Sequence, residues 1–340
     1  VCIHRLPYEK SILWPLGSRC ATCYKPIAWY DNLPVLSYCL LRGRCRMCGA
    51  RFTSGYFFVE LLTGLCFAGL FYLEAVVNVH DLPAIRQILF GGLLWFPPVQ
   101  VWAIFGVHIV LICFLIIASV VDLEHFEIPL PVTMTGTVVG LIFATLLPWP
   151  WPDPPPARLP AAKAAIAGFW QLVPVKLPET RSLYPWPPWW PLPEWLQPGG
   201  NWQTGLATGL AGMLAGMLML RAIRFVFGLG RGKEGLGIGD ADLMMMAGAF
   251  LGWQPIVVAF FVSVFPALLV GMGRLIFRGN QEMPFGPSLA LGIVITMLTW
   301  HWIDPLVRFV FFSGPFIAAL AGGSMAVLLL ASFAIRVIRR

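Results

Sequence analysis

Two short acidic segments border long hydrophobic runs, and their carboxylates are candidates for acid–base chemistry. In VDLEHFEIP, Asp122 follows such a run, and in GLGIGDADL, Asp240 precedes one. Ionisable groups next to a membrane core are costly, so each is a functional hypothesis. If the helices bring both carboxylates together on one side, they cannot both ionise easily and will share a proton. Such a pair can activate water and protonate a carbonyl oxygen, as in aspartic proteases.

Further residues in the two acidic segments can support this chemistry. These are Gly237, Gly239, Asp242, Glu124 and His125. We expect the two glycines to permit unusual backbone dihedrals and the close approach of an extended peptide. The alternative is that Asp240 only caps a helix, with Asp242 in its first turn, where the helix dipole favours negative charge. Similarly, Asp122 alone would be an interfacial end residue and His125 a solvated neighbour.

A second chemical feature is a pair of CxxC motifs separated by twenty-one residues. The four thiols are those of Cys20, Cys23, Cys45 and Cys48. Four thiolates at this spacing suit a structural Zn²⁺ site, which would stabilise a module too small for a core of its own. The alternatives are two disulfides or free thiols. Disulfides are disfavoured if the module lies in the reducing cytoplasm.

The composition requires that these groups be positioned by membrane helices. Hydrophobic residues make up 58% of the 340 and charged residues 11%, with a mean hydropathy of +0.78. Continuous apolar runs of about 20 residues predict spanning helices, and their lack of alternation excludes a β-barrel. The predicted runs are 56–78, 99–121, 131–148, 202–220, 243–273, 284–302 and 309–335. The predicted fold class is an all-α polytopic membrane protein, a helical bundle.

Basic residues predict the orientation, because Lys and Arg mark the cytoplasmic side. One layout places 17 of the 23 basic residues inside. Membrane orientation explains the net charge of +7 more simply than nucleic-acid binding does, and we predict no nucleic-acid partner. The layout requires residues 243–273 to enter and leave on one side, as a short helix ending near Trp253 followed by a longer one. The short arm must then be shielded by other helices. Both acidic segments lie on the cytoplasmic side.

We predict four regions along the chain. Residues 1–55 form a cytoplasmic tetracysteine zinc module, 56–148 carry the first acidic segment, and 201–340 carry the second. Between them, 149–200 form a Pro/Trp-rich external insert, since the stretch 148–198 contains 15 of the 30 prolines and cannot be a spanning helix. In the run 202–220, the pairs Gly205/Gly209 and Gly212/Gly216 predict close helix packing.

In their order and spacing, these motifs resemble the bacterial type IV prepilin peptidases, membrane aspartic proteases of the GxGD class. The motifs that carry the resemblance are HRLP, the two CxxC pairs with WYDNLPVLSY between them, YFFVELLTG, VDLEHFEIP, GIGDADLMMMAGAFLGW and MPFGPSLALG. The resemblance covers nearly the whole chain apart from the insert. Members of the family begin with a membrane helix, so we expect a hydrophobic segment upstream of Val1.

The resemblance implies an enzyme of the bacterial inner membrane, with its active site on the cytoplasmic side. Its substrates would be type IV prepilins or pseudopilins of pilus and type II secretion systems, cut after a Gly that precedes a hydrophobic helix. Asp122 and Asp240 match the two catalytic aspartates, and the four cysteines match the zinc set. Many members also methylate the new N-terminus with S-adenosylmethionine, which makes that cofactor an expectation. The sequence identifies no residues that bind it.

Two positions depart from the family pattern. Leu130 stands where an Asp is common, and Asp242 stands where a Lys usually follows the GD motif. A negative charge at Asp242 disfavours an ionised Asp240, so we predict activity displaced to higher pH. We also expect the basic leader of a prepilin to meet Glu124, Glu127 or Glu234, and the segment from Pro284 to Pro287 is a candidate lining of the active site.

Two other classes of protein can contain the same residues. A proton-coupled transporter would use Asp122 and Asp240 as a relay, although their position at the membrane edge argues against it. A zinc-stabilised scaffold of a secretion or pilus machine would retain the cysteines without catalysis.

Overall fold

The computed structural model describes residues 3, 18–82, 85, 97, 99–147, 186–187, 193–196, 201–231, 237–278 and 284–338. The regular elements in these residues are helices. The chain divides into two compact units, Val1–Val77 and Asn78–Arg340. Within the described residues there is no β-sheet, only two isolated bridges beside the cysteine pairs. The predicted all-α fold class is confirmed.

The first unit joins the cysteine-rich segment to one long apolar helix. Its elements are η2 (Trp29–Asn32), α2 (Leu36–Leu40), α3 (Ser54–Phe71) and η3 (Tyr72–Val76), which continues α3. The stretch Ser54–Val76 is long and apolar enough to cross a membrane. Most of its large apolar side chains are exposed, as expected of a helix surrounded by lipid.

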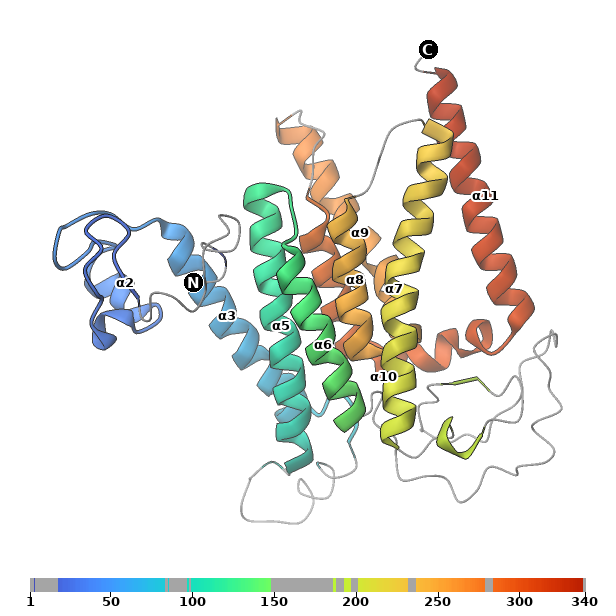
Figure 1. The fold of residues 1–340 in the computed structure, drawn as a ribbon, viewed down its shortest axis with the longest axis horizontal. Helices are drawn as coiled ribbons and strands as arrows, with labels where there is room; N and C mark the ends of the chain where they lie inside the picture. The colour runs from blue at the N-terminus through green and yellow to red at the C-terminus, as the bar shows by residue number, and fades with distance from the viewer. Residues whose placement is uncertain are drawn as a thin grey trace. The chain divides into compact units, whose positions relative to one another are not determined.

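The second unit is a bundle of long helices (Figure 1). Its elements are α5 (Val99–His125), α6 (Leu130–Leu146), α7 (Trp202–Arg231), α8 (Ile238–Leu251), α9 (Trp253–Arg278), α10 (Gly286–Phe311) and α11 (Gly314–Ile338). Five of these, together with Ser54–Val76, make six candidate membrane spans among the described residues. The protein is therefore a multi-pass membrane protein.

Several predicted runs differ from the helices that form; for example, the run 284–302 continues as α10 to Phe311. The run 131–148 becomes α6, which has 17 residues and is shorter than the candidate spans. The run 202–220 continues as α7 to Arg231, so Arg221 and Arg224 lie inside the helix. Basic side chains do not end a helix, because their long aliphatic stems allow the charged groups to reach the membrane surface.

Helix α8 lies in the interior of the bundle, between α6, α7 and α9 (Figure 1). Every residue from Asp240 to Leu251 is buried, so protein rather than lipid surrounds this short apolar helix. Gly252 has a φ of +86° and separates α8 from α9, which begins at Trp253. The predicted division of 243–273 into a short shielded helix and a longer one is present.

Small residues allow α7 and α8 to pack closely. A Cβ atom added to Gly212 would collide with the backbone of Gly248 and Gly252, and one added to Gly216 would collide with the backbone of Met244. These contacts confirm the predicted close approach at the Gly212/Gly216 pair. They fix the position of α8 against α7.

Most of the predicted insert 149–200 lies outside the described residues. Of its described parts, Trp186 donates a hydrogen bond to Thr208 of α7 at 3.0 Å. The carbonyl of Trp195 accepts one from Thr204 of the same helix at 2.5 Å. These two contacts attach the described tryptophans to the beginning of α7.

Candidate active site and metal cluster

The carboxylate of Asp122 lies in the last turn of α5 and meets the start of α10. Its side chain is buried, and Oδ2 accepts a hydrogen bond of 2.8 Å from the backbone N–H of Gly286. Gly286 is the first residue of α10, where backbone N–H groups lack partners within the helix. A Cβ atom at Gly286 would lie 2.6 Å from Oδ2. Glycine therefore leaves the space that the carboxylate occupies.

Asp240 occupies the first turn of α8 and is also buried. A Cβ atom at Gly237 would lie 3.4 Å from Oδ2 of Asp240, so this glycine lies beside the carboxylate. Gly239 packs on Ile128, six residues after Asp122. The end of α5, the start of α8 and the start of α10 thus lie at one end of the bundle, the upper end in Figure 1. The structure brings together two carboxylates that are 118 positions apart in the sequence.

The two glycines of the GxGD segment act differently from the prediction. Gly237 has an ordinary extended conformation, with φ −67° and ψ 148°, and Gly239 is a helical residue of α8. The expectation of unusual dihedrals is wrong. A Cβ atom at Gly239 would lie 2.8 Å from the Cβ of Ile128, so this glycine permits close packing of α8 on the segment between α5 and α6.

Asp242 is buried and forms an ion pair with Arg221 of α7, with 3.5 Å between Oδ1 and Nη2. This cation offsets the negative charge that was predicted to disfavour an ionised Asp240. The predicted displacement of activity to higher pH stays a prediction, and we now expect it to be small. Arg221 was missed as a site residue because the predicted helix ended at residue 220.

Exposed acidic groups lie next to the buried pair. Glu124 and Glu127 follow Asp122 at the end of α5, and both are exposed. The Nε2 atom of His125 lies 3.9 Å from the Glu124 carboxylate. Leu130, which replaces an Asp common in similar sequences, is exposed at the start of α6. Glu234, the third acid predicted to meet a basic leader, lies outside the described residues.

The four cysteines of the two CxxC motifs form one cluster that can hold a metal ion. Their sulfur atoms all lie within 4.8 Å of one another, and none is in a disulfide. The sulfurs of Cys20 and Cys48 are 3.8 Å apart. A tetrahedral site with metal–sulfur bonds of about 2.3 Å has edges of about 3.8 Å, so the cluster fits such a site. Hydrogen bonds from the backbone of Cys23 and Thr22 lower the pKa of Cys20, which favours the thiolate there, whereas desolvation and the neighbouring thiols raise the pKa of Cys48.

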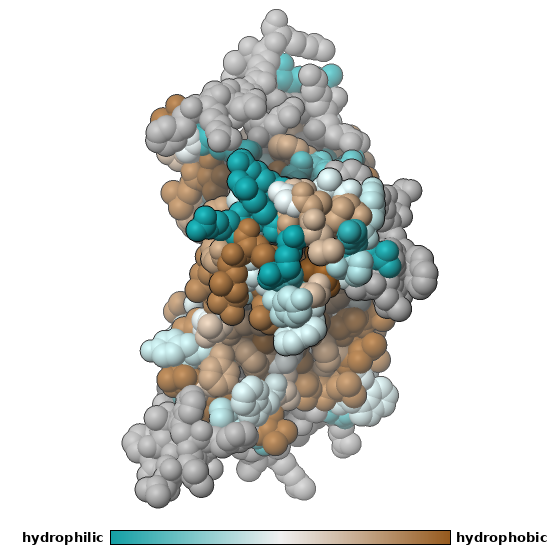
Figure 2. Space-filling model, turned by 90° about the vertical axis from the view of Figure 1, so that its left-hand side faces the viewer, coloured by the Kyte–Doolittle hydropathy of each residue, from teal (hydrophilic) through white to brown (hydrophobic). Residues whose placement is uncertain are grey.

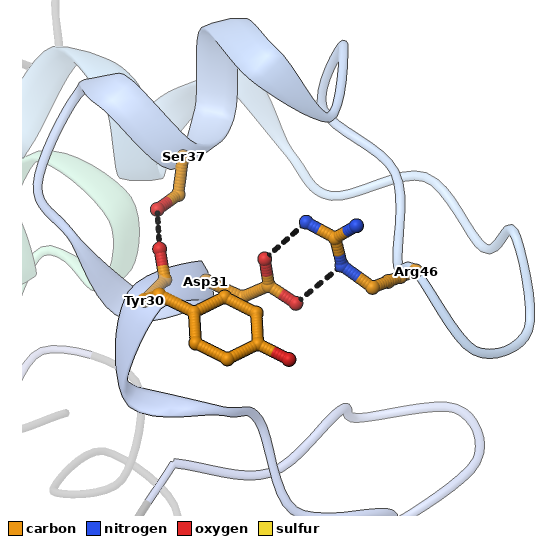
Figure 3. Close-up of polar contacts among 4 residues, drawn as sticks. All are labelled: Tyr30, Asp31, Ser37 and Arg46. Atoms are coloured by element: carbon orange, nitrogen blue, oxygen red, sulfur yellow. Dashed lines mark hydrogen bonds and ion pairs between the residues drawn. The ribbon is translucent and has the colours of Figure 1, made fainter.

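An ion pair links the second CxxC motif to the segment before α2 (Figure 3). The guanidinium of Arg46 donates two hydrogen bonds, of 2.6 and 2.7 Å, to the carboxylate of Asp31. It also lies over the ring of Tyr30. Beside this pair, the hydroxyl of Ser37 donates to the carbonyl of Tyr30 at 3.1 Å. The two hydrogen bonds from Arg46 hold the pKa of Asp31 below its ordinary value.

Comparisons with known proteins agree with the motifs. The family model "Type IV leader peptidase family" matches residues 109–178 and 195–272, and "Bacterial Peptidase A24 N-terminal domain" matches 1–73. The chain belongs to the type IV leader peptidase family. The first match includes both buried aspartates, and the second includes the cysteine cluster. No solved structure shows a significant match.

Curated relatives cover most of the chain. A protein named "Prepilin leader peptidase/N-methyltransferase" in Myxococcus xanthus is 26% identical over 90% of this chain and 68% of its own length. One of the same name in Klebsiella pneumoniae is 28% identical over 75% of this chain and 79% of its own. In Escherichia coli, a "Type 4 prepilin-like proteins leader peptide-processing enzyme" is 26% identical over 82% and 74%.

Proposed function

We propose that the protein is a prepilin leader peptidase, an aspartic endopeptidase in which Asp122 and Asp240 are the catalytic pair. The observation that carries this proposal is their burial together at one end of the bundle, in a member of the leader peptidase family. The family assignment and the printed names of the relatives support prepilins and prepilin-like proteins as the substrate class, to which we add pseudopilins as part of the proposal.

The two carboxylates account for peptide hydrolysis if they carry one proton between them. The ionised carboxylate takes a proton from water as the water oxygen attacks the scissile carbonyl carbon, and the protonated one donates its proton to the carbonyl oxygen. When the intermediate collapses, the C–N bond breaks and the leaving amine takes the proton that the first carboxylate gained from water. A hydroxyl of the intermediate returns a proton to the second carboxylate. The N–H of Gly286 holds the Asp122 carboxylate in place through these steps.

The substrate is expected to present a basic leader to the exposed Glu124 and Glu127 while its hydrophobic helix stays in lipid. Cleavage would then follow the Gly between these parts, at the cytoplasmic face of the inner membrane. The Glu124→Gln/Glu127→Gln double variant tests this placement. We expect it to raise KM for a substrate with a basic leader and to leave kcat unchanged, because neither residue touches the reacting bond. An unchanged KM would contradict the placement.

The decisive experiment incubates the purified full-length protein with a prepilin peptide. Asp122→Asn and Asp240→Asn are each expected to abolish cleavage, since one carboxylate cannot serve as both acid and base. Asp242→Asn is the matched control on the same helix, and it should retain cleavage because its carboxylate pairs with Arg221. Cleavage that survives either of the first two substitutions refutes the catalytic pair.

We assign Zn²⁺ to the cysteine cluster, because four thiolates at tetrahedral spacing suit this metal and close the site against catalysis. Its role would be to stabilise the module. The relatives' names also imply N-methylation with S-adenosylmethionine. Among the described residues we identify no set of side chains that fits this cofactor, and no step is derived through it. Labelled S-adenosylmethionine added to the cleavage assay would test the second activity.

A further inference from the structure

Helix α2 of the first unit presents an apolar surface that none of the described residues of its module covers. Leu36 and Leu40 are four residues apart, so they lie on the same side of the helix, and they are 60% and 79% exposed. Ser37, between them in sequence, is buried and bonds to the carbonyl of Tyr30. The short helix is therefore amphipathic, with its leucines facing outward.

The position of α2 against α3 places these leucines where the membrane span begins. The N–H of Val35 donates a 2.7 Å hydrogen bond to the carboxylate of Glu60, and the ring of Tyr38 packs on that of Phe57 at 5.4 Å. Glu60 is six residues, or about 9 Å along the axis, from the start of α3 at Ser54. Helix α2 thus lies beside the first two turns of a helix that enters lipid.

Exposed apolar side chains are also found along the span itself. Phe58, Leu62 and Leu65 of α3 are 62%, 47% and 62% exposed, as befits side chains that face acyl chains. In Figure 2, hydrophobic side chains lie directly beside hydrophilic ones on the face that is shown. We expect the exposed side chains of α3 to face lipid, and α2 lies beside the helix that carries them.

The net positive charge of the module favours an anionic partner. Residues 18–52 contain six basic side chains and one acidic side chain, Asp31, which is bonded to Arg46. Two of the basic residues, Arg42 and Arg44, directly follow α2 and are exposed. This excess of positive charge repels a basic peptide and attracts anionic lipid headgroups.

We propose that α2 is an interfacial anchor that binds the surface of an anionic phospholipid leaflet. Leu36 and Leu40 enter the boundary between headgroups and acyl chains, while Arg42 and Arg44 bind the phosphate groups above it. The anchor fixes the cysteine module at the height of the membrane surface. This inference depends on the module and α3 alone, and it stands whether or not the protein cleaves prepilins.

The test measures amide hydrogen exchange of residues 36–44 in full-length protein reconstituted into nanodiscs. The discs contain phosphatidylcholine alone or phosphatidylcholine with phosphatidylglycerol. In the parent protein, the anionic lipid should slow exchange by up to about 25-fold, since each arginine near an anionic surface strengthens binding about fivefold. Arg42→Gln/Arg44→Gln should lose only this dependence on anionic lipid. Leu36→Ser/Leu40→Ser should lose protection in both discs.

Met47→Ser is the matched control, because Met47 is an exposed apolar residue of the same module outside α2. It should behave like the parent protein. Equal exchange in the parent and the leucine variant would overturn the proposal. Protection of the parent protein that is equal in the two kinds of disc would also overturn it, because it would mean that protein covers this surface. Faster exchange of residues 45–52 in the leucine variant would show that this variant unfolds the module. In that case the arginine variant alone decides the question. If anionic lipid slows its exchange as much as in the parent protein, the anchor is refuted.

Discussion

Substituting Gly212 with alanine should separate α7 from α8. A Cβ atom at this position would lie 2.7 Å from the Cα of Gly252 and still closer to the carbonyl oxygen of Gly248. Carbon atoms in ordinary contact are about 3.5–4.0 Å apart, so the two helices must separate by about 1 Å. Backbone cannot turn aside as a side chain does, and overpacking of this kind costs about 1–3 kcal/mol.

The same displacement should reduce activity, because α8 carries Asp240. A shift of about 1 Å in a reacting group can reduce the rate by about 100-fold. The matched control is Gly228→Ala, in the same helix α7, where an added Cβ atom meets nothing within 4 Å. This control should be neutral or slightly stabilising, since alanine favours a helix over glycine by up to about 1 kcal/mol.

Thermal unfolding in detergent and cleavage of a prepilin peptide measure the two effects. The Gly212→Ala variant should unfold at a lower temperature than Gly228→Ala and cleave more slowly at saturating substrate. If the two variants are equally stable and equally active, close packing of α8 on α7 does not position the proposed catalytic pair.

Three further predictions concern separate parts of the molecule. Gly286→Ala should slow cleavage by displacing the Asp122 carboxylate, whereas Gly106→Ala, at an open position on α5, should not; equal rates would exclude the positioning role. The ion pair with Arg46 lowers the pKa of Asp31, so it stabilises the module above about pH 4 and loses this effect as the pH falls through the lowered pKa. Arg46→Gln should therefore speed amide exchange in the module at neutral pH but not at low pH, and a ratio of rates independent of pH would contradict this. Removing the metal with a chelator should raise exchange in residues 18–52 and leave the helices of the second unit unchanged; an unaltered module would show that the cluster holds no stabilising metal.

Local patterns predicted the helices well because continuous apolar runs have few alternatives in a membrane. They predicted helix ends poorly, as α7 shows: its apolar run stops at residue 220, but hydrogen bonding continues through Arg221 to Arg231. The short length of α8 was predictable because basic residues on both sides of 243–273 required the chain to return to the cytoplasmic side, which leaves room for one short and one longer helix.

The candidate site was predictable only in part. Residue types and the family resemblance indicated Asp122 and Asp240, and the CxxC spacing indicated the cysteine cluster. The donor to Asp122 is a backbone N–H that is 164 residues away, so no side-chain pattern could reveal it. The ion pair between Arg221 and Asp242 joins two helices and depends on their packing. Such contacts are properties of the assembled bundle.

The burial of α8 has a consequence for how the protein is made. With 14 residues, the helix is about 21 Å long, less than the roughly 30 Å of a hydrocarbon core. It is therefore poorly suited to insert alone during synthesis, and we expect it to enter as a hairpin with α9 after α7 is in place. Asp240 would then reach Asp122 only when the bundle has assembled. A nascent or partly inserted chain would contain both carboxylates and yet be unable to hydrolyse other proteins in the membrane.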